Sequence, residues 1–301
     1  MTLQDLHIRK LDTVYSGGGT NCLVEIPRGG SWPNLTVEYG EVTFRRVLFD
    51  GGRRGGFWTV RNLTLDECRF EGQQREALYF YAVAGETNIR NTEFAMTLGK
   101  DPALTFCQTS TGCPAMSGVV NIVGNRFSGI RTALLYSPWS CDAGAQGVRD
   151  QNASPVEVNF CYNGVTTVAG TIVSLNPALN DTIRINRNSF LAVPGRYAIK
   201  NSAENAGAPV VADARENWWG EGDNSGPGSG DPLSPIADPV TGTAAAGTGG
   251  LVQASVRFDP WIGMAGSSTG GAPVSGMGGC EAVPGSVRAF ADGALGVVAM
   301  I

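Results

Sequence analysis

Apolar and polar positions repeat along the middle of the chain. Seven eight-residue segments align to one template in which positions one, three and eight are mostly apolar. The segments are Val42–Phe49, Leu63–Phe70, Thr87–Phe94, Val120–Phe127, Val158–Val165, Ile183–Phe190 and Ala212–Trp219. The alternation at positions one and three predicts a β-strand whose alternate residues face inward.

A second predicted strand follows each of the middle segments. These strands are Ala77–Val83, Ala103–Cys107, Thr132–Tyr136, Thr171–Leu175 and Arg196–Lys200, and the loop after each varies in length. We find no convincing amphipathic helix of ten residues, so the pattern predicts an all-β fold. A coil of little more than twenty residues with two or three short strands cannot bury its apolar face alone, and such coils are expected to stack into a solenoid.

Position six of the template is asparagine in the last four copies. These residues are Asn125, Asn163, Asn188 and Asn217. Asparagine tolerates a left-handed backbone and can bond to neighbouring backbone groups. Stacked asparagines can also bond to one another, as in the ladders of stacked strands. The spacing therefore predicts an Asn ladder at one corner of the coils.

The C-terminal part contains a more specific pattern. The segment Ala214–Gly220 reads ARENWWG, residues 224–227 read NSGP, and Val256–Trp261 reads VRFDPW. With the repeat, this ending resembles the right-handed parallel β-helix (pectate-lyase-like) region of secreted and cell-surface bacterial and archaeal proteins. The resemblance covers roughly residues 35–262 and implies a single-stranded right-handed parallel β-helix. That fold hosts lyases, hydrolases, adhesins and structural proteins, so function has to be argued from a site.

The domain organisation follows from the repeat and from composition. We expect irregular first coils in 1–40, β-helix coils in 41–219, a C-terminal cap and loop in 220–262, and a Gly/Ser-rich linker with an apolar tail in 263–301. The tail is too short to cross a bilayer. It is expected to fold back on the chain or to contact another subunit, with a processing signal as a further alternative.

Three tryptophans belong to the C-terminal ending. Trp218, Trp219 and Trp261 are interpreted as an apolar cap over the last coil, with a sugar-stacking platform as the alternative.

Composition excludes several functional classes. The net charge of −5 gives no electrostatic basis for binding nucleic acid. No run of 18 apolar residues is present, so no membrane-spanning helix is predicted. The single histidine, His7, makes a histidine-built metal site or catalytic triad a poor prediction. No cofactor is predicted; Ca²⁺ is only weakly suggested by Glu221 and residues 223–226, which lack the spaced carboxylates of an EF-hand loop.

Cysteine spacing bears on localisation. Of seven cysteines, Cys107, Cys113 and Cys141 are candidates for disulfides, because Cys107 and Cys113 bracket a short polar loop and Cys141 lies in the next loop. Cys68 and Cys161 are equally well interpreted as small buried apolar residues. The first ten residues lack the apolar core of a signal peptide, so either the protein stays inside the cell or a signal peptide has been removed. The disulfide candidates favour the second alternative, and we expect an extracellular or cell-surface protein whose signal peptide is not present in this chain.

Two places could carry chemistry. On the outward positions two and four, Arg184 and Asp213 are expected to stack, with Asn186 and Arg215 beside them. The resemblance to β-helix lyases implies a uronate-binding patch with an arginine as base or clamp, whereas a surface ion-pair network explains the same residues. The second place is the long loop 137–155, where Trp139, Asp142 and Arg149 could bind a sugar or pack the loop onto the body.

These observations favour an extracellular or cell-surface β-helix protein with a structural or binding role, including self-assembly into a larger assembly or filament. The predicted partners are therefore copies of the chain, polysaccharide, or both. One alternative is a polysaccharide lyase or glycoside hydrolase that acts on acidic polysaccharide. Another is a glycan-binding adhesin or tailspike-like module.

Overall fold

A computed structural model describes fourteen segments of the 301-residue chain. The described residues are 2–10, 22–26, 41–52, 54–96, 101–107, 116–138, 155–167, 170–178, 180–191, 195–202, 210–220, 226–229, 235–253 and 255–261.

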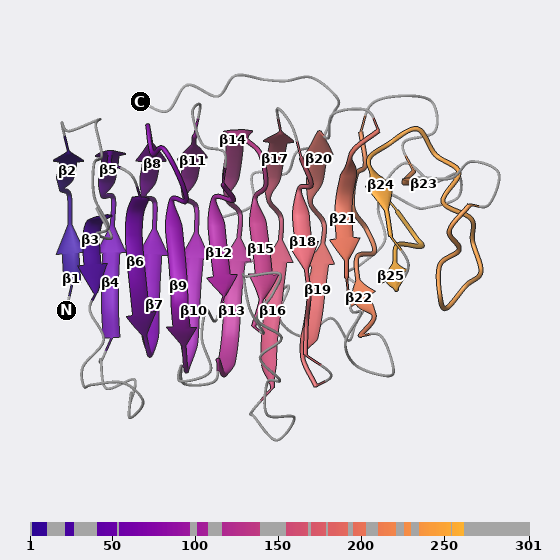
Figure 1. The fold of residues 1–301 in the computed structure, drawn as a ribbon, viewed down its shortest axis with the longest axis horizontal. Coiled ribbons are helices and arrows are strands. Elements are labelled where there is room, and N and C mark those ends of the chain that lie inside the picture. The colour runs from indigo at the N-terminus through magenta and orange to yellow at the C-terminus, as the bar shows by residue number, and fades with distance from the viewer. Residues whose placement is uncertain are drawn as a thin grey trace, which may run out of the picture.

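The described strands form three parallel sheets that run side by side along the molecule (Figure 1). Sheet A contains β1 (Thr2–Gln4), β4 (Glu41–Arg45), β7 (Asn62–Asp66), β10 (Glu86–Arg90), β13 (Gly118–Val123), β16 (Val156–Cys161), β19 (Thr182–Asn186), β22 (Ala212–Asp213) and β25 (Val256–Arg257). Sheet B contains β2 (His7–Lys10), β5 (Leu48–Gly51), β8 (Arg69–Glu71), β11 (Glu93–Ala95), β14 (Arg126–Ile130), β17 (Gly164–Thr167) and β20 (Ser189–Leu191). Sheet C contains, in spatial order, β23 (Gly228–Ser229), β24 (Leu251–Val252), β21 (Tyr197–Asn201), β18 (Val173–Leu175), β15 (Leu134–Ser137), β12 (Leu104–Cys107), β9 (Leu78–Val83), β6 (Arg54–Val60) and β3 (Cys22–Ile26).

The order of the strands shows a parallel β-solenoid. From β1 to β21 the chain visits sheets A, B and C in turn, and each return to a sheet pairs the new strand with the one from the preceding coil. The eight-residue template therefore spans two strands, because its first half lies in sheet A and its closing aromatic residue lies in sheet B. Strands β1, β2 and β3 of the N-terminal stretch pair in register with β4, β5 and β6.

The inward positions form one continuous core. Positions one and three of sheet A are buried, and position eight places a column of phenylalanines behind sheet B. The ring centroids of Phe70 and Phe94 lie 5.2 Å apart and those of Phe94 and Phe127 lie 4.7 Å apart, with nearly parallel planes. Parallel in-register pairing brings like residues together, so a repeated Phe becomes a stack of rings.

The corner between sheets A and B corrects one expectation. The left-handed residue is at position five, and the asparagine follows it. Positive φ angles of 50–68° occur there at Arg46, Glu67, Asn91, Gly124, Tyr162, Arg187 and Glu216. A left-handed residue turns the strand sharply, and the next side chain, at position six, then points into the core.

The buried asparagines form a ladder along this corner. Asn163 Oδ1 accepts hydrogen bonds from the backbone N and the Nδ2 of Asn125 at 2.9 and 3.1 Å. Asn188 Oδ1 does the same for Asn163 at 2.8 and 3.1 Å, and Asn217 Oδ1 for Asn188 at 2.8 and 3.0 Å. Each Nδ2 also donates to a main-chain carbonyl of the preceding coil, so every step satisfies buried polar groups of two coils.

The same column continues toward the N-terminus with other residue types. The backbone N of Thr92 donates to Asn125 Oδ1 at 2.9 Å, and the backbone N of Cys68 donates to Thr92 Oγ1 at 3.3 Å. The Cys68 thiol donates to the Phe44 carbonyl at 3.4 Å, in the place that the asparagine amide takes elsewhere. Burial raises the pKa of this thiol, which favours the neutral, donating form.

Aromatic residues cover the C-terminal end of the core. Trp219 is fully buried, with its ring 5.5 Å from that of Phe190. Trp261 packs against the core beside Phe258, at 6.2 Å between centroids. Trp218 is partly buried and bridges to Ser189, which extends sheet B by one residue pair.

Asp238 anchors this cap through four backbone amides. Its carboxylate accepts hydrogen bonds from the backbone N of Val240 and Thr241 at 2.9 and 3.0 Å, and from those of Phe258 and Asp259 at 2.7 and 2.9 Å. Burial acts to raise the pKa of Asp238, but the four amides outweigh it and hold the pKa below its usual value.

We therefore expect Asp238→Asn to destabilise the protein at neutral pH and much less in acid. Because the folded pKa is depressed, the carboxylate's contribution is complete above the unfolded pKa of about 3.9 and is lost as pH falls through the lower folded value. Urea unfolding of both proteins at several pH values measures the difference. An equal difference at every pH would contradict the role of the charge.

Candidate functional site

The outward rows of sheet A form the candidate surface. The register pairs Asn88 with Asn121, Asn121 with Asn159, Asn159 with Arg184, and Arg184 with Asp213. The neighbouring row pairs Arg45 with Asp66, Asp66 with Arg90, and then continues to Val123, Cys161 and Asn186. The two rows are those expected from the template, because a strand with period two turns positions two and four to the same face.

Arg184 is held by the preceding coil. Its guanidinium forms an ion pair with Glu157 at 2.5 Å and donates to Asn159 Oδ1 at 3.3 Å. Arg184 and Asp213 are register partners, but Arg184 forms its ion pair with Glu157, which lies directly before position one of its template segment. Both side chains are partly exposed, at 24% and 34%.

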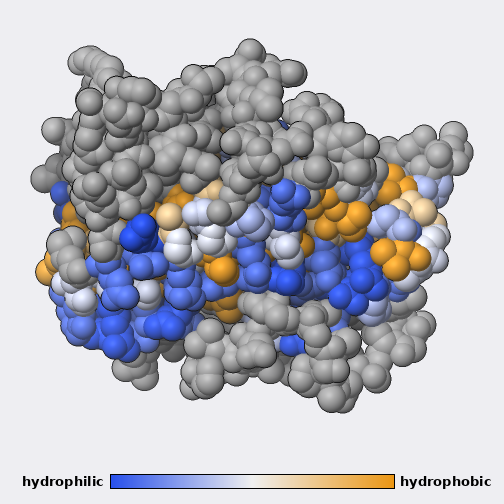
Figure 2. All heavy atoms as spheres, turned by 90° about the horizontal axis from the view of Figure 1, so that it is seen from below, coloured by the Kyte–Doolittle hydropathy of each residue, from blue (hydrophilic) through white to orange (hydrophobic). Residues whose placement is uncertain are grey.

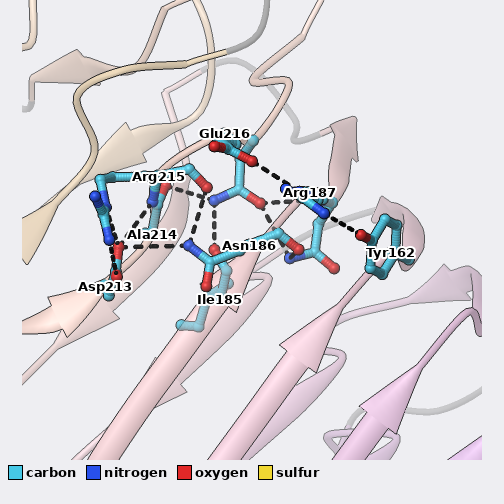
Figure 3. A network of polar contacts seen from close by, with 10 residues as sticks. Tyr162, Ile185, Asn186, Arg187, Asp213, Ala214, Arg215 and Glu216 are labelled. Carbon is cyan, nitrogen blue, oxygen red and sulfur yellow. Dashed lines mark hydrogen bonds and ion pairs between the residues drawn. The ribbon is translucent and has the colours of Figure 1, made fainter. Parts of the chain in front are cut away.

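Arg215 is held by Asp213 through two parallel hydrogen bonds (Figure 3). Arg215 Nε and Nη2 donate to the two carboxylate oxygens at 2.9 and 2.7 Å. Asn186 Nδ2 donates to Asp213 Oδ1 at 3.4 Å and to the Arg215 carbonyl at 3.1 Å. The bond to Asp213 raises the pKa of Arg215. Burial acts to raise the pKa of Asp213, but the Arg215 guanidinium lowers it overall.

A third ion pair lies at the adjacent corner (Figure 3). Arg187 Nε donates to Glu216 at 2.7 Å, and its guanidinium lies over the ring of Tyr162, 5.5 Å from the centroid, and also bonds to the Tyr162 hydroxyl. These three residues occupy position five in successive coils, so the left-handed corner places them in a column. Burial acts to lower the pKa of Arg187, but the bonds to Glu216 and Tyr162 raise it overall.

Arg187, Glu216, Tyr162 and Glu157 were not among the residues predicted for this site. The same template could have identified them, because three of them occupy position five and Glu157 directly precedes position one.

Amide side chains continue the surface toward the N-terminus. Asn121 Nδ2 donates to Asn88 Oδ1, and Asn159 Nδ2 donates to Asn121 Oδ1, each at 3.0 Å. Glu157 accepts a further hydrogen bond from Asn159 at 3.0 Å. An outward row of bonded amides therefore runs parallel to the buried ladder and ends at Arg184.

The charges of this surface cancel locally. Arg184, Arg187 and Arg215 are each paired with a carboxylate, from Glu157, Glu216 and Asp213 respectively. The bond to Asp213 raises the pKa of Arg215, which makes this guanidinium a poor general base. A neutral network also has little excess positive charge to attract a uronate. The Arg184–Glu157 and Arg187–Glu216 pairs join successive coils, and the Arg215–Asp213 pair lies within one coil. The arrangement is therefore better suited to stabilising the sheet than to proton abstraction.

Most of the candidate residues in the loops lie outside the part of the chain that the structure describes. Trp139, Cys141, Asp142, Arg149 and Cys113 lie outside the described residues, as do residues 221–225 and 262–301. Cys107 and Cys161 are each disulfide-bonded, whereas Cys68 is a buried free thiol. The interpretation of Cys161 as only a small buried apolar residue is therefore wrong, because it forms a disulfide.

On the face shown in Figure 2, the described residues are mainly hydrophilic along the length of the molecule, with hydrophobic residues in smaller groups. Within the described ranges, no group of three or more His, Cys, Asp or Glu side chains could hold a metal ion. The described part of the chain also contains no helix that is long and apolar enough to cross a bilayer.

Comparison of the chain with family models, curated proteins and solved structures gives no match. The resemblance of the C-terminal ending therefore remains an expectation carried by the residues themselves.

Proposed function

We propose that this chain is a right-handed parallel β-helix of the secreted or cell-surface type that acts as a structural or binding scaffold. The observation that carries the proposal is the pairing of both predicted catalytic arginines with carboxylates of the same sheet face. One ion pair between coils, one ion pair within a coil and a row of bonded amides occupy the face on which a lyase of this architecture would need a free base. The handedness is supported by the strong preference of parallel crossover connections for the right-handed form.

An oxidising environment is part of the proposal. Cys107 and Cys161 are disulfide-bonded, and disulfides persist mainly outside the cytosol. Reduction is expected to break the disulfide bonding of Cys107 and Cys161 and to leave the hydrogen-bonded ladder of the core in place.

Self-assembly would use the end of the solenoid away from the tryptophan cap. Strands β1, β2 and β3 are the last strands of their sheets, and Leu3 and Ile8 are only partly buried. Edge strands offer unpaired backbone groups to another chain. Light scattering across a concentration series measures assembly. A chain that stays monomeric throughout would remove assembly from the proposal and leave the binding role.

The catalytic alternative is tested by activity on acidic polysaccharides. We expect no unsaturated uronate product from pectate or alginate, and stability losses of about 1 kcal/mol or less for Arg184→Ala and Arg215→Ala, because partly exposed ion pairs contribute little. Absorbance of the unsaturated product and urea unfolding measure the two quantities. Product formation that either substitution abolishes would establish a lyase instead. Glycan binding without turnover would favour an adhesin-like role.

A further inference from the structure

The middle of the buried ladder contains the one Asn-Gly pair of the chain, Asn163-Gly164. In a flexible chain, asparagine followed by glycine is the pair most prone to deamidation, because glycine lacks the Cβ that would hinder attack by its own backbone nitrogen and gives the backbone the required freedom. This inference concerns the chemistry of the ladder and goes beyond the proposed scaffold role.

The reaction balances without an external oxidant or reductant. The backbone N of Gly164 attacks Cγ of Asn163 and forms a C–N bond, and the Cγ–Nδ2 bond breaks. The leaving amide nitrogen takes up the proton lost from the Gly164 nitrogen and departs as ammonia. Water then opens the resulting cyclic imide at either carbonyl, which leaves aspartate or isoaspartate in place of asparagine.

The folded protein holds both reacting groups away from this path. The Asn163 side chain is buried, and its Nδ2 donates to the Ile122 carbonyl at 2.9 Å and to Asn188 Oδ1 at 3.1 Å. The Gly164 nitrogen donates to the Asn125 carbonyl at 2.9 Å. Attack would therefore break bonds to three neighbouring residues at a position that water does not reach.

The product does not fit the ladder. An aspartate at position 163 has no amide hydrogen for the Ile122 carbonyl and would place a buried negative charge against Asn188 Oδ1, which is itself an acceptor. Isoaspartate adds a methylene group to the main chain between the left-handed corner and β17, and it would shift the register of the coil.

We propose that Asn163-Gly164 is a deamidation site that is protected in the folded solenoid and becomes reactive when this coil unfolds. Modification of the open chain prevents the ladder from re-forming, so unfolding becomes irreversible with time. The extent of deamidation at Asn163 therefore increases with the time that the coil has spent unfolded.

The full chain can be tested with a matched variant. A Cβ added at Gly164 would meet nothing within 4 Å, and the residue lies outside the left-handed backbone region, so Gly164→Ala should fold while slowing imide formation. Both proteins are incubated at mildly alkaline pH, native or in urea, with disulfides kept oxidised. Samples taken over time are returned to native buffer, and the refolded fraction is measured by circular dichroism. Peptide mass mapping measures deamidation at residue 163.

We expect the native protein to stay unmodified and the unfolded protein to deamidate at Asn163 while its refolded fraction falls. The refolded fraction of Gly164→Ala should fall several-fold more slowly than that of the unsubstituted protein. Thiol exchange affects both proteins equally, so it cancels in the comparison. Refolded material should contain unmodified Asn163, and material that fails to refold should be enriched in the modified residue. Equal modification of native and unfolded protein, or equal modification of the refolded and failed fractions, would overturn the proposal.

Discussion

Replacement of Asn188 by alanine is expected to destabilise the protein by about 3–5 kcal/mol. The side chain is buried, and its loss leaves the Asn163 backbone N–H and the Phe160 carbonyl without the bond that each makes to it, whereas Asn217 Oδ1 keeps its bond to the Asn188 backbone N–H. Each buried polar group left unsatisfied costs about 1–3 kcal/mol. Urea unfolding followed by circular dichroism measures the change in the free energy of unfolding.

Two further variants separate the ladder from general packing. Asn121→Ala removes an asparagine from the outward row, where partial exposure lets water replace the lost bonds, and we expect a cost of about 1 kcal/mol. Asn188→Thr keeps a side-chain acceptor of the kind that Thr92 supplies in an earlier coil, so its cost should be intermediate. Equal costs for the substitutions at Asn188 and Asn121 would show that the buried ladder has no special role.

Replacement of Phe94 by alanine is expected to cost about 3–5 kcal/mol, the usual range for a buried phenylalanine. The ring is fully buried between those of Phe70 and Phe127, so its removal leaves a cavity that backbone pairing on both sides prevents from closing. Glu93→Ala, at the adjacent outward position, is the matched control and should cost less than about 1 kcal/mol. Thermal and urea unfolding of the two variants give the comparison; similar losses for both would contradict a stacked aromatic core.

The inward and outward rows could be predicted from the sequence because they depend on short-range regularities. A period of two fixes which face a residue takes, and seven copies of one template align positions such as Asn159 and Arg184 before any coordinate is known. The buried asparagines were visible for the same reason, since one residue type recurs at one position. Neither inference requires knowledge of how the loops fold.

The left-handed corner could not be predicted, because residue type carries little signal there. Arg46, Glu67 and Tyr162 all adopt positive φ although such residues rarely do so. The stacked coils on both sides impose this conformation, and the strain is offset by tertiary bonds. Thr92 and Cys68 were missed in the ladder because they satisfy the same backbone groups with different atoms.

Charge partners were the least predictable part of the candidate site. Arg184 has Asp213 as its register partner but forms its ion pair with Glu157. The long arginine side chain reaches across rows, so the register alone does not determine which carboxylate it meets. This choice changes the functional interpretation, since a paired guanidinium stabilises the sheet face and a free one could act on a substrate.

The central claim is that a buried asparagine ladder joins successive parallel coils, and hydrogen exchange of side-chain amides measured by NMR tests it most directly. The account predicts that the Nδ2 protons of Asn163 and Asn188 exchange only when the protein unfolds, because they are buried and bonded between coils. The Nδ2 protons of Asn121, on the partly exposed outer row, should exchange far faster. Fast exchange at Asn163 and Asn188, at rates similar to that of Asn121, would contradict the account.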